Sequence, residues 1–282
     1  MSDVGGAGGG AGVRRPAVAG TFYPAESAHL AREVDAMIEA AEPVEVSGRL
    51  VGLVEPHAGY MFSGGVAAAG YRQLAPRMFE RVILVGPSHR AAFPAVAVWD
   101  GTAFATPLGE VSLDHEAIAG LVEADSLIVR RNAVHDGEHS LEVQLPFLQR
   151  RLQDFRLVPL VMGRQDAATC ERLGRALARV ARPPGSLLIA SSDLSHYHPY
   201  DEAVALDGWA LARMADFDPE GLLAGLRQGA CEACGGGPIA AVLFAARELG
   251  AREVEVLSYQ NSGDVTGDRS QVVGYPACAI TG

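Results

Sequence analysis

The sequence predicts a single α/β domain with a largely parallel or mixed central sheet that helices cover on both faces. Apolar, β-rich runs alternate with helical patterns from residue 50 to residue 280. The runs at 51–54, 82–85 and 186–190 are almost continuously apolar, as strands buried on both faces are. A length of 282 residues without a repeat or linker fits one large unit, and the sheet edges could hold antiparallel strands.

The elements follow one another in a regular order. A first helix is predicted at 27–41, where Leu30, Val34 and Ile38 share one face. Strands are predicted at 50–54, 82–85, 95–99, 157–162, 186–190, 253–258 and 271–280, and helices at 65–74, 115–123, 143–153, 167–180, 203–214, 219–226 and 238–249. Pro146 requires its helix to begin nearby or to kink. Residues 1–12, almost all Gly, Ala, Ser and Asp, are predicted to be disordered ahead of a domain at 13–282.

Composition excludes several classes of function. The net charge of −11 argues against a surface for nucleic acid or anionic membranes. All 23 basic residues are arginine, which excludes a lysine Schiff base, a pyridoxal phosphate lysine and a Walker-type phosphate loop. The longest strongly apolar stretch, 239–246, is too short to span a bilayer, and the first residues lack the apolar core of a signal peptide. We therefore expect a cytoplasmic protein, whose four cysteines are packed, metal-binding or redox thiols.

Histidines follow three of the predicted central strands. His57 follows the first, Ser88 and His89 follow the second, and Asp193 and His196 follow the third. Because ligands of open α/β sheets bind at the carboxyl ends of the strands, these side chains are expected to converge. One such histidine alone is more often a surface or capping residue. Two imidazoles with an anion suit an open Fe(II) site, with Zn or Cu as alternatives.

The segment CEACGGGPI adds two thiols. Cys234 precedes a glycine run and a proline that opens a helix, where free amides and the helix dipole are expected to lower the pKa of its thiol. One CxxC is a weak signal, and two buried small residues are the plainer alternative. Cys231 is predicted to be packed or to lie behind the site, and Cys170 and Cys278 to lie in the core.

Two further polar segments are less specific. In VHDGEHSLEVQLPF, His139 is predicted to be a pocket residue, His135 to lie on the surface, and the acids could cap the following helix. In NSGDVTGDRSQVVGY, Asp264 and Asp268 lack calcium-loop spacing, so turn formation is predicted.

These segments together resemble the Memo family, whose prokaryotic members are called AmmeMemoRadiSam system protein B. The stretches RRPAVAGTFYPA, PHAGYMFSG, GPSH, EHSLEVQLPFL, SSDLSHY and CGGGPI occur in the family's order between residues 14 and 280. The resemblance implies a fold similar to class III extradiol dioxygenases, with His57, His89 and Cys234 as metal ligands. It also places Asp193 and His196 in the metal pocket. Those dioxygenases complete their iron site with a carboxylate, whereas a Cys234 thiolate shifts preference towards copper, zinc or a differently tuned iron.

Three functions are compatible with these residues. The first is a redox enzyme with Fe(II), or Cu or Zn, in which His196, oriented by Asp193, transfers protons. His139 is a further catalytic candidate, and the predicted substrate-pocket residues are Tyr60, Ser88 and Tyr197. The alternative is a non-catalytic metal-binding or adaptor protein that works with radical-SAM and AMMECR-type partners. The third is a zinc hydrolase; a serine hydrolase is disfavoured because no GxSxG elbow occurs.

Overall fold

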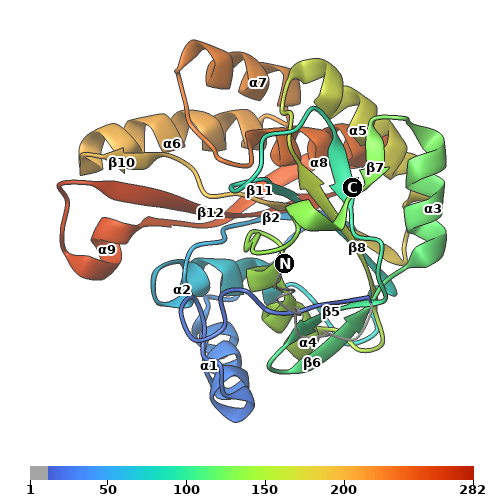
Figure 1. Cartoon of the computed structure of the whole chain (residues 1–282). Coiled ribbons are helices and arrows are strands. Elements are labelled where there is room, and N and C mark those ends of the chain that lie inside the picture. The colour runs from blue at the N-terminus through green and yellow to red at the C-terminus, as the bar shows by residue number, and fades with distance from the viewer. Residues whose placement is uncertain (1–11) are drawn as a thin grey trace, which may run out of the picture.

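A computed structural model describes residues 12–282, so the tail predicted to be disordered lies, apart from Gly12, outside the described residues. The described chain forms an α/β domain around a nine-stranded mixed sheet (Figure 1). Helices cover both faces of this sheet. The predicted fold class is therefore confirmed.

Four parallel strands form the centre of the sheet. Their spatial order is β2–β9–β3–β8, and each pairs in parallel with its neighbour. Apart from the first residue of β8, all their residues are buried, which explains why their sequences are apolar without alternation. Their bounds are Leu50–Glu55 (β2), Ser186–Ser191 (β9), Arg81–Pro87 (β3) and Arg156–Met162 (β8).

The flanking strands are mostly antiparallel, as the sequence allowed. On one side β12 (Val272–Thr281) pairs antiparallel with β2, β11 (Glu253–Asn261) and β10 (His196–His198). On the other side β4 (Val96–Val98) pairs antiparallel with β8 and parallel with β7 (Ile128–Arg130).

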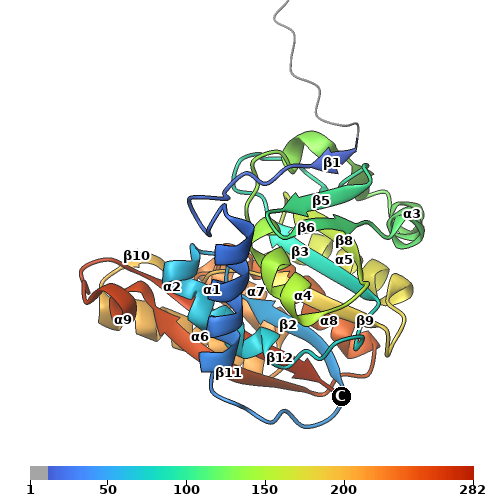
Figure 2. The ribbon, with the colours of Figure 1, turned by 90° about the horizontal axis from the view of Figure 1, so that it is seen from below.

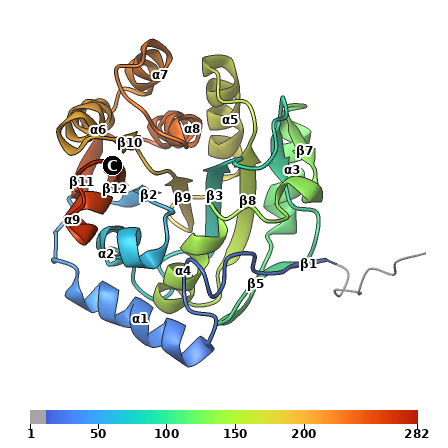
Figure 3. The same cartoon turned by 60° about the vertical axis from the view of Figure 1, so that its left-hand side comes forward.

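Two helical layers enclose the sheet (Figure 3). One layer contains α5 (Ala167–Val180), α6 (Tyr200–Ala215), α7 (Pro219–Gln228) and α8 (Gly236–Glu248). The other contains α1 (Ser27–Ala40), α2 (Tyr60–Tyr71) and α4 (Leu145–Arg151). The remaining helices are α3 (His115–Ala124), which packs on α5, and α9 (Ser262–Thr266), which follows β11. Within residues 12–282, no helix has the length and apolar sequence that a membrane crossing requires.

A small second sheet was not predicted. It joins β1 (Val13–Arg14), β5 (Ala103–Thr106) and β6 (Gly109–Ser112), which lie together in Figure 2. Because β1 pairs in parallel with β5, the start of the described chain is held against its middle.

The helices predicted at 65–74 and 143–153 differ from their predicted form. The helix predicted at 65–74 already begins at Tyr60, and its small residues let it lie against β2. A Cβ atom at Gly70 would lie 1.6 Å from Oε1 of the buried Glu55. The helix predicted at 143–153 is a 3₁₀ turn at Glu142–Gln144 followed by α4, whose first turn contains Pro146 as the geometry of proline requires.

Candidate metal centre

Three side chains that are distant in sequence meet at the carboxyl edge of the central strands. His57 follows β2, His89 follows β3, and Cys234 lies just before α8. Their candidate ligand atoms all lie within 4.8 Å of one another. Sγ of Cys234 is 3.2 Å from Nε2 of His57, and the rings of His57 and His89 stand nearly perpendicular with centroids 5.1 Å apart. The structure thus brings together the three residues predicted to bind a metal.

Hydrogen bonds fix which nitrogen of His57 carries the proton. Nδ1 lies 2.8 Å from Oγ of Ser191, whose own proton is donated to the carbonyl of Ser140 at 2.6 Å. The amide nitrogen of Gln144 donates to the same hydroxyl oxygen at 2.9 Å, and the Tyr71 hydroxyl fixes that amide by donating to its oxygen. Because Ser191 has no proton left for His57, Nδ1 must be the donor. Nε2 therefore presents its lone pair to the centre.

His89 is oriented in the same way by Glu138. Oε1 of Glu138 lies 2.9 Å from Nδ1 of His89, and Oε2 accepts the His89 backbone N–H at 2.6 Å. Burial opposes ionisation, but hydrogen bonds from His89 and Ser140 lower the pKa of Glu138 to about 2. A carboxylate only accepts, so Nδ1 of His89 carries the proton and Nε2 is free for a metal. Histidine ligands of protein metal sites commonly have this carboxylate partner.

The predicted low pKa of Cys234 is wrong for the metal-free chain. Burial, followed by the charge of Asp193, raises the pKa of this thiol to about 12. The Asp193 N–H group points at the sulfur from 3.3 Å, but its effect is smaller. The reason is that desolvation of a thiolate outweighs a few amide dipoles. A bound metal ion would release this proton, since the thiolate is the ligand.

Asp193 supports His57, which differs from its predicted role. Its Oδ1 accepts the backbone N–H of His57 at 2.8 Å, and its Oδ2 lies 4.0 Å from Nε2 of the same residue. Burial raises the pKa of Asp193 to about 7. The predicted orientation of His196 by Asp193 is replaced by a contact of 2.8 Å between Nδ1 of His196 and the Leu194 carbonyl. This contact again leaves Nε2 as the free nitrogen.

The two histidines of the 134–147 segment lie in different surroundings, and the pocket role of His139 stays a prediction. His139 stacks on His89 with ring centroids 4.6 Å apart and lies edge-on to His57, beside the predicted ligands. Burial lowers its pKa to about 4, so its imidazole is neutral. His135 was predicted to lie on the surface, and this is wrong. Its ring is buried between Trp99 and Phe104, where burial lowers its pKa to about 3.

Each of the three predicted substrate-pocket residues is close in sequence to a histidine of the candidate site. Their role in binding a substrate stays a prediction. Tyr60 is buried and donates its hydroxyl to the Val143 carbonyl at 2.7 Å. Ser88 donates to the Ala91 carbonyl at 2.7 Å within a turn. Tyr197 is 69% exposed.

The remaining polar predictions concern packing and turns. Cys170, Cys231 and Cys278 are all buried, as expected for packed thiols. Asp264 lies within α9, where its carboxylate accepts the backbone N–H of the N-cap Asn261 and the Tyr200 hydroxyl, and Asp268 accepts from Ser270. Asp264 thus lies in a short helix and not in a turn as predicted, whereas Asp268 bonds to its own segment as turn residues do.

A buried ion pair holds the loop that carries Glu138 and His139. Arg14, in β1, donates to the carboxylate of Glu142 and to the Glu138 carbonyl. Glu142 also accepts the Tyr23 hydroxyl at 2.5 Å and two backbone N–H groups of the segment before α1. The fully satisfied carboxylate fixes this loop against the start of the domain.

Comparison with known proteins identifies the family. A family model described as "Memo-like protein" matches residues 14–279. The chain belongs to the Memo family. It is 40% identical to a MEMO1 family protein of Ignicoccus hospitalis, over 94% of this chain and 97% of the relative. It is also 40% identical to one of Aeropyrum pernix (95% and 99% covered) and 38% identical to one of Methanothermobacter thermautotrophicus (93% and 98%).

A solved structure also matches this Memo family chain. It is the crystal structure of an uncharacterized protein from Escherichia coli K12, with a TM-score of 0.51 and 16% identity. The match covers 83% of this chain and 100% of the other. At this identity it shows the fold alone.

A cavity of about 730 Å³ opens beside the candidate centre of this Memo chain. Cys234 and His196 lie in its wall, next to the apolar side chains of Leu194, Leu223 and Leu226. Its lining also includes the charged side chains of Arg227 and Glu232. A small molecule bound there would contact both the thiol and a histidine.

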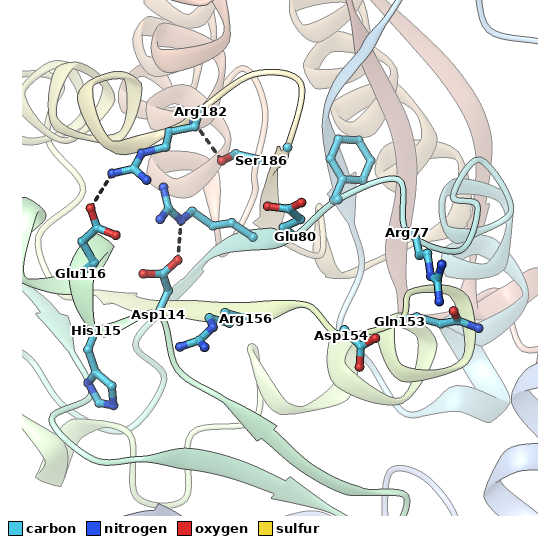
Figure 4. A pocket seen from close by; sticks show the side chains of 13 residues that line it. Arg77, Glu80, Asp114, His115, Glu116, Gln153, Asp154, Arg156, Arg182 and Ser186 are labelled. Carbon is cyan, nitrogen blue, oxygen red and sulfur yellow. Dashed lines mark hydrogen bonds and ion pairs between the residues drawn. The ribbon is translucent and has the colours of Figure 1, made fainter.

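A second cavity, of about 700 Å³, lies where β3, β8 and β9 begin, at the opposite edge of the sheet (Figure 4). Two ion pairs lie in its wall, Arg81 with Asp114 at 2.7 Å and Arg182 with Glu116 at 2.5 Å (dashed in Figure 4). Of the three candidate ligands, Cys234 lines the first cavity, and none of the three lines this one.

Sequence reasoning missed the partners that orient the histidines. Ser191 and Gln144 lie 134 and 87 positions from His57, and Glu138 lies 49 positions from His89. Only Glu138 carried a signal, as an acid next to a predicted pocket histidine.

Proposed function

We propose that this Memo family chain is a metal-dependent redox enzyme that holds Fe(II) with His57, His89 and Cys234 and acts on a small molecule. The observation that carries the proposal is the convergence, within 4.8 Å, of two fixed imidazole lone pairs and a thiol. Two neutral nitrogens and one anion with room for further ligands suit Fe(II), and Cu or Zn would also accept this donor set. The donors therefore fit the group.

The side chains around the centre supply binding and proton transfer. When bound, the metal supplies redox chemistry at the positions that the protein leaves open. Nε2 of His196, in the wall of the larger cavity, is free to accept or donate a proton. The neutral ring of His139 lies against both ligand histidines and is the second candidate for proton transfer. Leu194, Leu223 and Leu226 exclude water and would contact the apolar part of a substrate.

A second candidate function is metal binding without turnover, in an adaptor for radical-SAM and AMMECR-type partners. Two exposed apolar side chains close in sequence to site residues are the surface features that such partners would contact. Met61, four positions after His57, is 71% exposed, and Tyr197, next to His196, is 69% exposed. A zinc hydrolase is the third candidate. Purified protein that contains zinc and no iron would favour it.

Elemental analysis of anaerobically purified protein tests the proposal. We expect one equivalent of iron per chain in the wild type and its loss in His57→Ala and Cys234→Ser. His29→Ala is the matched control, because the His29 side chain lies exposed on α1, where it pairs with Glu33 of the same helix.

Oxygen uptake with added Fe(II) and phenolic or reduced substrates then separates the functions. Uptake that disappears in the two ligand variants supports the enzyme. Stoichiometric metal without turnover, together with a stable complex with the partners, supports the adaptor. Undiminished activity in variants that have lost the metal refutes the proposal.

A further inference from the structure

We propose that Gln165 is a positioning residue that holds the backbone of Cys234 so that its sulfur faces His57. The inference rests on the proposed metal centre and adds a residue that belongs to neither the ligands nor the acid–base groups. Gln165 lies in the loop between β8 and α5 and lines the cavity beside Cys234.

Both ends of the Gln165 side-chain amide bind the Cys234 segment. Its Nε2 donates to the Cys234 carbonyl at 2.9 Å, and its Oε1 accepts the N–H of Gly237 at 2.8 Å. One rigid planar group therefore spans the turn that leads from the cysteine into α8. The two contacts fix both the position and the orientation of that turn.

The start of α8 needs such a partner because it has no cap of its own. The N-cap residue is Gly235, which has no side chain to accept the free N–H groups of the first turn. Gln165 supplies one acceptor from 72 positions away, and the Ser192 hydroxyl supplies another by accepting the N–H of Gly235 at 2.9 Å.

The glycine run explains why the groups that hold residues 234–237 come from other parts of the chain. The hydrogen bonds from Gln165 to this segment are called the Gln165 clamp below. A Cβ at Gly235 would lie 2.3 Å from the Ser191 carbonyl oxygen, and one at Gly237 would lie 2.7 Å from Cβ of Gln165. Close packing thus requires glycine at these positions. Glycine also gives the backbone the most freedom, so a segment with three in a row does not hold its own shape. Gln165 and Ser192 restrict that freedom directly beside the ligand.

Two substitutions separate positioning from capping. Gln165→Glu keeps an oxygen for the N–H of Gly237 and loses the donor for the Cys234 carbonyl. Gln165→Met, of similar length, loses both. Asp166→Ala is the matched control, because Asp166 caps α5 by accepting the N–H of Thr169 at 2.8 Å. That control removes a helix cap from the adjacent residue without removing a bond to the Cys234 segment.

The first measurement is the rate at which iodoacetamide alkylates Cys234 in metal-free protein, with Cys234→Ser as the background. We expect Gln165→Glu to react about fivefold faster than the wild type, as loss of one hydrogen bond predicts, and Gln165→Met to react faster still. The second measurement is a Co(II) titration that follows the thiolate-to-cobalt charge-transfer band. The same variants should bind cobalt about fivefold more weakly and with a weaker band. Asp166→Ala should match the wild type in both.

The outcomes distinguish this inference from the proposed function. If Gln165→Glu and Asp166→Ala react at the same rate, the clamp is refuted, and unchanged alkylation and cobalt spectra in both Gln165 variants refute it too. If Gln165→Met does not fold, the alkylation rate and cobalt affinity of Gln165→Glu alone decide whether Gln165 positions Cys234. A wild type that gives no charge-transfer band refutes the metal centre, while the alkylation rates still test whether Gln165 holds Cys234.

Discussion

Replacing Glu138 by Gln changes one atom of the group that orients His89. The carboxylate now accepts three hydrogen bonds, from Nδ1 and the backbone N–H of His89 and from the N–H of Ser140, at 2.6–2.9 Å. A glutamine keeps one accepting oxygen. Its NH₂ group must then face either the backbone N–H or the ring Nδ1–H of His89, and both are donors. In either orientation His89 loses one of the two hydrogen bonds that direct its Nε2 towards the centre.

The magnitude follows from the loss of a carboxylate partner behind a metal ligand. Such changes weaken metal binding roughly 10- to 100-fold, which corresponds to about 1.4–2.8 kcal/mol. The Glu138 side chain is only 1% exposed, so water cannot replace the missing acceptor. We expect the cobalt affinity of Glu138→Gln to fall within this range.

The assay is a competition titration of Co(II) against a chromogenic chelator at neutral pH. Asp114→Asn is the matched control, because it makes the same carboxylate-to-amide change in a buried pair, with Arg81, at the opposite edge of the sheet. The control should lose stability and keep the wild-type affinity. A Glu138→Gln affinity within about twofold of the control would refute the reasoning, since hydrogen bonding to His89 would then contribute nothing to metal binding.

Two further predictions concern other residues. Ser191→Ala removes the acceptor of the His57 Nδ1–H group, so the same titration should show about tenfold weaker cobalt binding, and an unchanged affinity would contradict the assigned tautomer. The second prediction is a pH dependence of stability. Burial opposes the ionisation of Asp114, but hydrogen bonds from Arg81 and from the α3 N-terminus lower its pKa. Because the folded-state pKa is the lower one, the stabilisation is fully present above the unfolded value of about 4 and is lost as pH falls through the folded value. The difference in denaturation midpoint between wild type and Asp114→Asn should therefore shrink in acid, and a constant difference would contradict it.

The central fold was predictable because its strands are buried on both faces. Continuous apolar runs identify β2, β3 and β9, and helical periodicity identifies α1 and α5. The missed strands β1, β5, β6, β7 and β10 have two to four residues each and depend on partners far along the chain. Val13, for example, pairs with Ala103. Such short segments carry no periodicity, so tertiary contacts alone define them.

The candidate site was predictable to the level of which residues meet, and no further. His57 and His89 were expected together because both follow parallel strands. The sign of the Cys234 pKa shift and the burial of His135 were not predictable, because both depend on the surrounding packing. A local motif shows the helix dipole near a thiol but not the desolvation that outweighs it.

The 138–144 loop connects these observations. It supplies Glu138 to His89, the His139 ring to both ligand histidines, and the Ser140 carbonyl and Gln144 amide to the hydroxyl that orients His57. The loop is in turn held at its Glu142 carboxylate by groups that precede α1. Removing one partner of a buried ion pair costs about 3–5 kcal/mol, so this attachment is strong. The orientation of both imidazoles therefore depends on residues 14–23 as well as on the strands that carry the histidines.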